Sequence, residues 1–286
     1  MLFLKSLLRR LSDGFLFTSL FLSFGAGLMA HQTFQLLQLP ANEERNLQYF
    51  IFFATLCSYN FHWWLTPFSA SELNRSKWSI SNRWVHEVLI LVGAIGSAWW
   101  AYPLLKYWPA ILPSILLTFL YSAPKLPFWP FIHLKKFAYG KTIFLAMVWM
   151  YVTTALPIWV SGNGFDIPEL LFCTSRFFGI YAICILFDWR DRETDKKEGI
   201  KSLITWFNEK GIDRLFSFSL VVFSTSTIAL INYGVPAYIL LVVLLPGALT
   251  ALLYKRAKKD FSDYLYYFVL DGLMLLSSAI TIFLPF

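Results

Sequence analysis

The amino-acid sequence predicts an all-α integral membrane protein with about nine transmembrane helices, on the basis of its composition, its apolar runs and its charge distribution. Of its 286 residues, 57% are hydrophobic and 14% are charged, and the mean hydropathy is +0.57. Soluble proteins contain ~45–50% apolar and ~25% charged residues, so a soluble domain is excluded. Uninterrupted apolar runs favour helices over the alternating strands of a membrane barrel.

Apolar runs long enough to cross a hydrocarbon core of about 30 Å occur along the whole chain. The first run follows the basic segment Lys5–Arg10 and also fits a signal peptide, with a cleavage-like segment at Ala26–Ala30. We expect a retained helix, because no other feature requires an even number of spans. Residues 1–286 are thus predicted to form a single polytopic membrane domain. The nine predicted spans are 14–30, 47–64, 84–102, 104–121, 138–160, 168–188, 213–232, 236–254 and 263–284.

The distribution of basic residues predicts the orientation of these spans. Nine crossings place the termini on opposite sides of the membrane. With a cytoplasmic N-terminus, all of the 24 Lys and Arg except Arg45, Lys106 and Arg176 fall on the cytoplasmic side. This asymmetry follows the positive-inside rule. The net charge of +7 therefore reflects topology rather than nucleic-acid binding, and we expect a multi-pass protein of the cell (inner) membrane.

A row of carboxylates follows the sixth predicted span. If the helix continues past the membrane surface, Asp188, Asp191 and Asp195 share one face, at positions i, i+3 and i+7. Like charges placed together repel unless a cation lies between them, and carboxylate oxygens suit Mg²⁺. The neighbouring basic residues Lys196, Lys197 and Lys201 could contact a diphosphate. The alternative is a solvated, mixed-charge loop that anchors the topology.

Two segments resemble motifs of a known family. Asp191-x-x-x-Asp195, followed by Gly199-Ile200-Lys201-Ser202-Leu203, is similar to the second aspartate-rich motif of the UbiA superfamily of intramembrane prenyltransferases. Tyr121-Ser122-Ala123-Pro124-Lys125 resembles the tyrosine-serine-proline-basic segment of the same family. The predicted layout of nine spans also agrees with that family.

The resemblance implies a helical bundle around a central cavity and a Mg²⁺-dependent transfer of a prenyl group from a prenyl diphosphate to a lipid-soluble acceptor. Asp191 and Asp195 would be the catalytic residues and would hold Mg²⁺ with help from Asp188. The substrate would contact Lys125 and three further residues, which are Tyr121, Asn60 and Lys201. The metal would neutralise the leaving diphosphate.

The first aspartate-rich motif of the family is missing. It should lie near Asn60, but Phe61, Trp64 and Phe68 occupy the positions where acids are expected. Without these carboxylates, a second Mg²⁺ loses its oxygen ligands, and an amide with the His62 imidazole makes a poor site for a hard cation. We expect a structural role for His62.

Two charges lie within predicted spans. Arg176 and Asp271 each lie about 12 Å from the nearer end of their own span, so their depths differ by only about 6 Å and an ion pair is geometrically feasible. A substrate or proton pathway is the alternative. Glycines in the first and third spans, Gly25, Gly27, Gly93 and Gly96, are expected to allow close helix packing.

Three functions remain open at this point. The first is a divergent prenyltransferase, which makes an enzyme the favoured interpretation. The second is a non-catalytic protein of the same fold that binds a lipid or quinone-like molecule or assists a partner enzyme. The third is a transporter that uses Arg176 and Asp271, although no inverted repeat supports it. The sequence predicts neither the acceptor, the prenyl length nor the oligomeric state.

Overall fold

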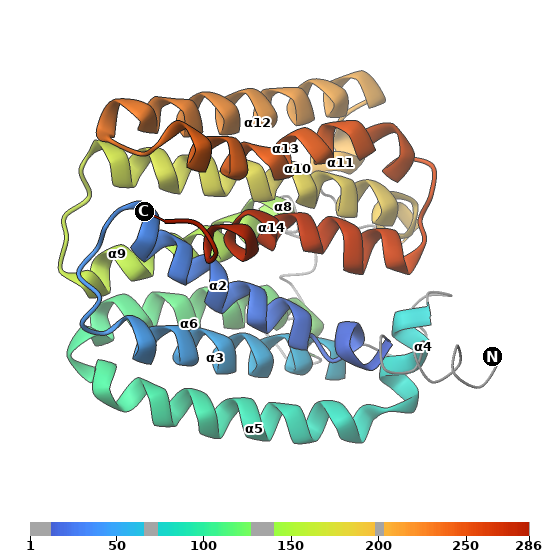
Figure 1. The fold of residues 1–286 in the computed structure, drawn as a ribbon. Helices are drawn as coiled ribbons and strands as arrows, with labels where there is room; N and C mark the ends of the chain where they lie inside the picture. Colours follow the sequence, from blue (N-terminus) through green and yellow to red (C-terminus); the bar gives the residue numbers. More distant parts are fainter. Residues whose placement is uncertain (1–12, 66–73, 127–139, 198–202, 286) are drawn as a thin grey trace, which may run out of the picture.

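The computed structural model describes residues 13–65, 74–126, 140–197 and 203–285, and these residues form an all-α bundle. The larger helices run side by side in alternating directions (Figure 1). They are α2 (Leu20–Leu36), α3 (Glu44–Trp64), α5 (Arg83–Ala101), α6 (Trp108–Ser122), α8 (Lys141–Met150), α9 (Leu156–Ser161), α10 (Ile167–Lys197), α12 (Glu209–Ala229), α13 (Ala237–Ala257) and α14 (Asp271–Thr281). The shorter pieces are α4 (Asn74–Ser81), α11 (Leu203–Trp206), the 3-10 turns η1 (Tyr102–Tyr107), η2 (Ala123–Lys125) and η5 (Leu230–Tyr233), and the π-helical turns η4 (Tyr151–Ala155) and η6 (Leu265–Leu270).

The helical class is confirmed, but nine separate membrane spans are not. Within the described ranges, five helical stretches are long and apolar enough to cross a membrane, and Leu265–Thr281 is a shorter apolar helix. The five stretches are Arg83–Lys125, Thr142–Ser161, Ile167–Lys197, Glu209–Tyr233 and Ala237–Ala257. Five long apolar helices indicate a multi-pass membrane protein.

The difference from nine has three physical causes. The ninth predicted span, 263–284, corresponds to Leu265–Thr281, which is apolar but shorter than the five stretches. Arg83–Lys125 is continuously helical, so the predicted spans 84–102 and 104–121 form a single stretch. In contrast, α2 and α3 correspond to the first two predicted spans but carry too many polar side chains to reach the hydropathy of a membrane span. The polar residues include His31, Gln32 and Gln35 in α2 and Glu44, Arg45, Asn46, Gln48, Asn60 and His62 in α3.

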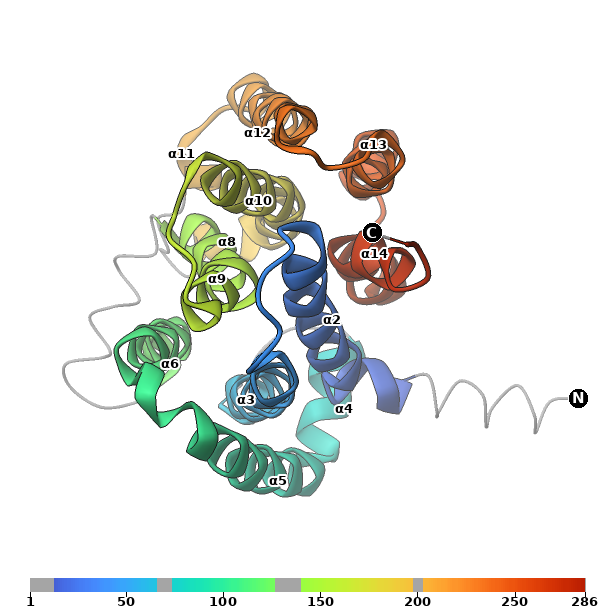
Figure 2. The same cartoon turned by 60° about the vertical axis from the view of Figure 1, so that its left-hand side comes forward.

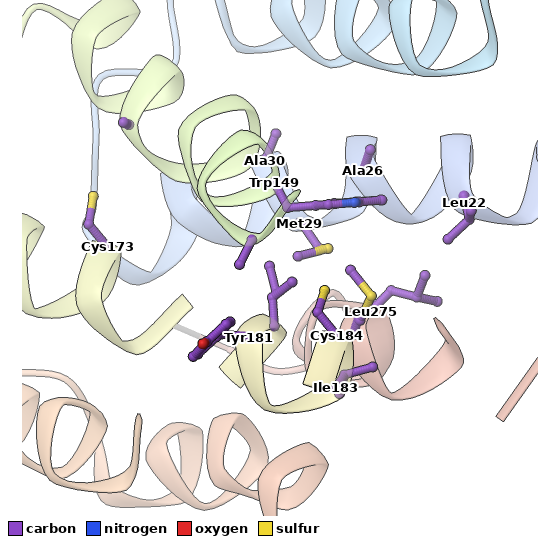
Figure 3. Close-up of a cluster of buried hydrophobic side chains, with 14 of the residues drawn as sticks. Leu22, Ala26, Met29, Ala30, Trp149, Cys173, Tyr181, Ile183, Cys184 and Leu275 are labelled. Carbon is purple, nitrogen blue, oxygen red and sulfur yellow. The ribbon is translucent and has the colours of Figure 1, made fainter. Parts of the chain in front are cut away.

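The middle of the bundle, where the resemblance implies a cavity, contains α2 (Figure 2). Side chains from α2, α8, α10 and α14 meet there (Figure 3). Met29 and Ala30 of α2 are fully buried, and Cys184 of α10 and Leu275 of α14 belong to the same apolar cluster. Burial of such side chains provides close packing rather than an open channel at this level.

Small residues allow the closest helix contacts, as the sequence predicts. A Cβ atom added at Gly93 would lie 2.6 Å from the backbone nitrogen of Cys57, and one added at Gly96 would lie 2.4 Å from the Phe53 ring. One at Gly25 would overlap Leu275. Gly27 is different, because its nearest neighbour lies at an ordinary 3.6 Å. Gly93 therefore sets how closely α5 approaches α3.

We predict that Gly93→Ala destabilises the protein although alanine favours helix. The added methyl group meets backbone atoms of Cys57, which cannot rotate away, and overpacking of this kind costs about 1–3 kcal/mol. Unfolding in detergent should show a lower midpoint for this variant. The matched control is Gly164→Ala, where an added Cβ has no neighbour within 4 Å. Equal midpoints for the two variants would contradict the packing argument.

Candidate functional site

The carboxylates that the sequence singles out lie on the last turns of α10. This helix continues without interruption from Ile167 to Lys197, so the predicted extension past the sixth span is confirmed. Asp188 and Asp195 are buried, and Asp191 is half-buried. The three acids therefore follow one side of a helix that is largely covered by its neighbours.

These carboxylates have protein partners. The Thr142 hydroxyl donates to Asp188 Oδ2, and Arg190 Nε donates to Asp191 Oδ1 at 2.9 Å. Among the residues that the structure describes, no three His, Cys, Asp or Glu side chains gather where a metal ion could be held. The Mg²⁺ site that the resemblance implies therefore stays a prediction. Lys201 lies outside the described residues.

Cations and aromatic rings alternate at the same end of the bundle, where α3, α6 and α10 end and α4 lies (Figure 1). The Arg75 guanidinium is 4.1 Å from the centroid of the Trp63 ring and 4.3 Å from that of the Tyr267 ring. Arg190 approaches the same Tyr267 ring at 5.0 Å, and Lys125 Nζ is 5.4 Å from the Trp63 ring. We call these five residues the cation–aromatic row.

Arg75 is held deep in the row. Its side chain is only 2% exposed, and it donates from Nη2 to the Ser19 hydroxyl at 3.1 Å, but its Nε–H has no hydrogen-bond partner among the described residues. Its backbone N–H donates to Asp263 Oδ2 at 3.2 Å. Burial lowers the pKa of the Arg75 guanidinium, and the neighbouring Tyr267 and Asp271 act in the opposite direction. An arginine remains charged in such surroundings because its ordinary pKa is so high.

The Arg190 side chain, 7% exposed, completes the other end of the row. Its Nη2 donates to the Tyr267 hydroxyl at 3.2 Å, and no residue that the structure describes forms a hydrogen bond with its Nη1. The π-helical turn η6 directs two successive tyrosines toward it, since the Tyr266 ring lies at 4.6 Å and the Tyr267 ring at 5.0 Å. Single π-helical turns of this kind are frequent at functional sites.

Asn60, predicted to bind substrate, is engaged within the protein. Its amide nitrogen donates to the backbone carbonyl oxygens of Thr18 and Leu56, and its Oδ1 is 2.7 Å from His86 Nδ1. The contact with Thr18 holds the turn before α2, in which Ser19 has a φ of 61°. Asn60 thus connects three segments of the bundle.

The segment that begins at Tyr121 lies beside the end of α3. The His62 ring stacks on the Tyr121 ring at 4.9 Å, His62 Nδ1 is 3.3 Å from the Ser122 hydroxyl, and Lys125 Nζ donates to the His62 carbonyl oxygen at 3.1 Å. The expected structural role of His62 agrees with these contacts. Of the aromatic residues in place of the first acidic motif, Phe61 stacks on Trp64, and Phe68 lies outside the described residues.

The proposed pairing of Arg176 with Asp271 is wrong. Arg176 Nη2 donates to the Met29 carbonyl oxygen at 3.2 Å and to Gln32 Oε1 at 3.0 Å. Asp271 instead lies close enough to Arg75 for the two charges to interact. Similar depth along two helices does not determine which faces of those helices meet, and that explains the error.

The sequence did not identify most of the cation–aromatic row. It assigned Arg75 and Arg190 to topology and gave no role to Trp63 or Tyr267. The only available signal was the position of Arg190 between Asp188 and Asp191.

No family model, no curated protein and no solved structure matches this chain. The UbiA resemblance therefore rests on the two short segments at Tyr121 and Asp191, and it stays a prediction.

We predict that Tyr267 stabilises the protein through both its ring and its hydroxyl. Tyr267→Phe loses the hydrogen bond to Arg190 and should cost about 1.5–3 kcal/mol. Tyr267→Leu also removes the ring between the two guanidiniums and should cost about 2 kcal/mol more. Chemical unfolding in micelles measures both. Tyr233→Leu, at an exposed tyrosine, is the matched control. A Tyr267→Leu variant no less stable than this control would refute the role of the ring.

We also predict how the buried charges couple. Arg176→Ala and Gln32→Ala should be non-additive by about 1 kcal/mol, since their side chains are hydrogen-bonded. Arg176→Ala and Asp271→Ala should be additive within about 0.5 kcal/mol. Double-mutant cycles of unfolding free energy test both statements. Strong coupling in the second cycle would restore the ion pair.

Proposed function

We propose that this protein is a divergent intramembrane prenyltransferase of the UbiA type that binds a prenyl diphosphate at the cation–aromatic row. The observation that carries the proposal is the convergence of the Arg75 and Arg190 guanidiniums on the single Tyr267 ring, each with an N–H group that has no hydrogen-bond partner within the described ranges. Buried donors without acceptors are costly. A phosphate oxygen is the acceptor that best fits a guanidinium.

The cation–aromatic row supplies positive charge in the region where the UbiA resemblance implies a metal ion. Arg75, Arg190 and Lys125 take the place of the second Mg²⁺ that would need the missing first acidic motif. Within the described ranges, Asp191 forms its only ion pair with Arg190. This carboxylate therefore helps to hold the Arg190 guanidinium in place. Cationic groups fixed in advance stabilise a developing anion without reorganisation.

The proposed reaction needs only two reactants, the prenyl diphosphate and the acceptor. The bond between C1 of the prenyl chain and the diphosphate oxygen breaks, and the diphosphate leaves with the electron pair. C1 then forms a bond to the lipid-soluble acceptor, which loses a proton to water. Arg75 and Arg190 would stabilise the departing diphosphate.

In the membrane, we propose that the cation–aromatic row faces the cytoplasm. Prenyl diphosphates have a charged head and an apolar tail, so a site at the end of a membrane bundle suits both parts. The basic residues concentrate at this end in the predicted topology. The N-terminus would be cytoplasmic, the C-terminus would lie on the other side, and the compartment would be the cell (inner) membrane.

A second candidate is a non-catalytic protein of the same fold that binds the lipid without transferring it. Two observations favour it. Aromatic residues replace the first acidic motif, and Asp188 and Asp191 are occupied by Thr142 and Arg190. The two candidates share the binding site and differ only in turnover.

We predict that the purified protein binds a non-hydrolysable farnesyl diphosphate analogue even in the presence of a chelator. Arg75→Gln and Arg190→Gln should each weaken binding about tenfold or more, because each removes a charge-assisted contact. Asp191→Asn/Asp195→Asn should weaken it less. The control is Arg45→Gln, at an exposed residue. Titration calorimetry or fluorescence quenching of the nearby tryptophan measures these affinities.

Two other outcomes have definite meanings. Binding that requires both Mg²⁺ and the two aspartates would refute binding by the arginines and favour the metal site of the family. Incubation with authentic farnesyl diphosphate and a membrane lipid extract separates the two candidates. Release of diphosphate together with a prenylated product supports the transferase, and unchanged ligand supports the non-catalytic protein.

A further inference from the structure

A third buried arginine, far along α10 from the row, lies beside a separate pocket. Arg176 is 7% exposed, and its Nε–H has no hydrogen-bond partner in the part of the chain that the structure describes. Its Nη2 contacts are to neutral oxygens of Met29 and Gln32, and its guanidinium lies 4.8 Å from the centroid of the Phe172 ring. Arg176 therefore carries a charge that its hydrogen bonds do not neutralise.

A charged side chain inside a membrane carries a high free-energy cost. Arg176 is nine residues into α10, or about 14 Å from the start of the helix, which is near the middle of a hydrocarbon core of about 30 Å. Charges at such depth are rare, and they are paired or functional. Within the described residues no carboxylate forms an ion pair with Arg176, and Glu169, two turns earlier on the same helix, does not reach it.

The pocket next to Arg176 has a polar wall and an apolar wall. It lies between α2, α10, α12, α13 and α14, which surround the same region in Figure 2. Gln32, Ser175 and Ser277 lie on the polar side with Arg176, and Phe223 and Val243 contribute apolar surface. The cavity volume is about 40 Å³, which is room for about three water molecules. This space suits a small polar head rather than a whole lipid.

We propose that this pocket binds the carboxylate of a single-chain lipid, with Arg176 as its counter-charge and the acyl chain running out into the bilayer. A carboxylate oxygen can accept a charge-assisted hydrogen bond from the Nε–H of Arg176. The pocket is too small for a phosphodiester with its headgroup, so a free carboxylate fits better. Gly179 and Gly247 let the Phe223 ring pack closely at the pocket wall, since an added Cβ atom would lie 3.0 Å and 2.3 Å from that ring.

The site is independent of the proposed prenyl diphosphate site. It uses Arg176 rather than Arg75 and Arg190, and it lies about 21 Å along α10 from Arg190 at 1.5 Å per residue. Failure of one proposal therefore leaves the other intact.

The test is equilibrium binding of radiolabelled palmitate to the full chain in nanodiscs of zwitterionic lipid, compared with hexadecanol and hexadecyl phosphate. We expect palmitate to bind about tenfold or more tightly than hexadecanol. Arg176→Gln should abolish this preference, and Arg176→Lys should retain part of it. The control Arg45→Gln, at an exposed arginine, should leave it unchanged.

A further variant keeps the charge of Arg176 and reduces the volume of the pocket. Ser277→Leu fills the polar wall of the pocket and should weaken palmitate binding about tenfold even if Arg176→Gln fails to fold. Equal binding of palmitate and hexadecanol by the wild-type protein would overturn the proposal. Tighter binding of hexadecyl phosphate than of palmitate would overturn the choice of carboxylate.

Discussion

The structure depends on its buried guanidinium groups. Aromatic rings, more than carboxylates, contact these groups. Arg75 contacts both Trp63 and Tyr267, and Arg190 contacts Tyr266 and Tyr267. Cation–π contacts of this kind are worth about 2 kcal/mol or more when desolvated, but they leave N–H groups without acceptors. The protein thus holds its charges in place without fully neutralising them. That excess positive charge at one end of a membrane bundle is what makes an anionic lipid head a suitable ligand.

The same residues hold the end of the bundle together. Arg75 comes from α4, Trp63 from α3, Arg190 from α10 and Tyr267 from η6, so the row connects segments that are distant in sequence. Asn60 and His62 add contacts to the turn before α2 and to the end of α6. Stability and the proposed ligand binding would therefore be coupled at this end, and binding variants need the exposed control at Arg45.

The sequence predicted the helical class and the extension of α10, because apolar runs and the spacing of Asp188, Asp191 and Asp195 depend only on local periodicity. It overestimated the number of spans, because the polar faces of α2 and α3 lower their hydropathy even though these helices lie within the bundle. It missed the row because a contact such as Arg75 with Tyr267 depends on how α4 packs against η6. The pairing of Arg176 with Asp271 failed for the same reason, since depth along a helix does not specify its facing side.

The central claim is that an isoprenoid diphosphate binds at the ring shared by Arg75 and Arg190. Photocrosslinking tests it most directly, with a prenyl diphosphate analogue that carries the photoreactive group on its terminal phosphate, followed by mass-spectrometric mapping of the labelled residues in the presence of a chelator. The account predicts labels on segments around Trp63, Arg75 and Tyr267 that excess farnesyl diphosphate removes. Labels confined to the outward faces of α12 and α13, or labels that farnesyl diphosphate does not reduce, would contradict it.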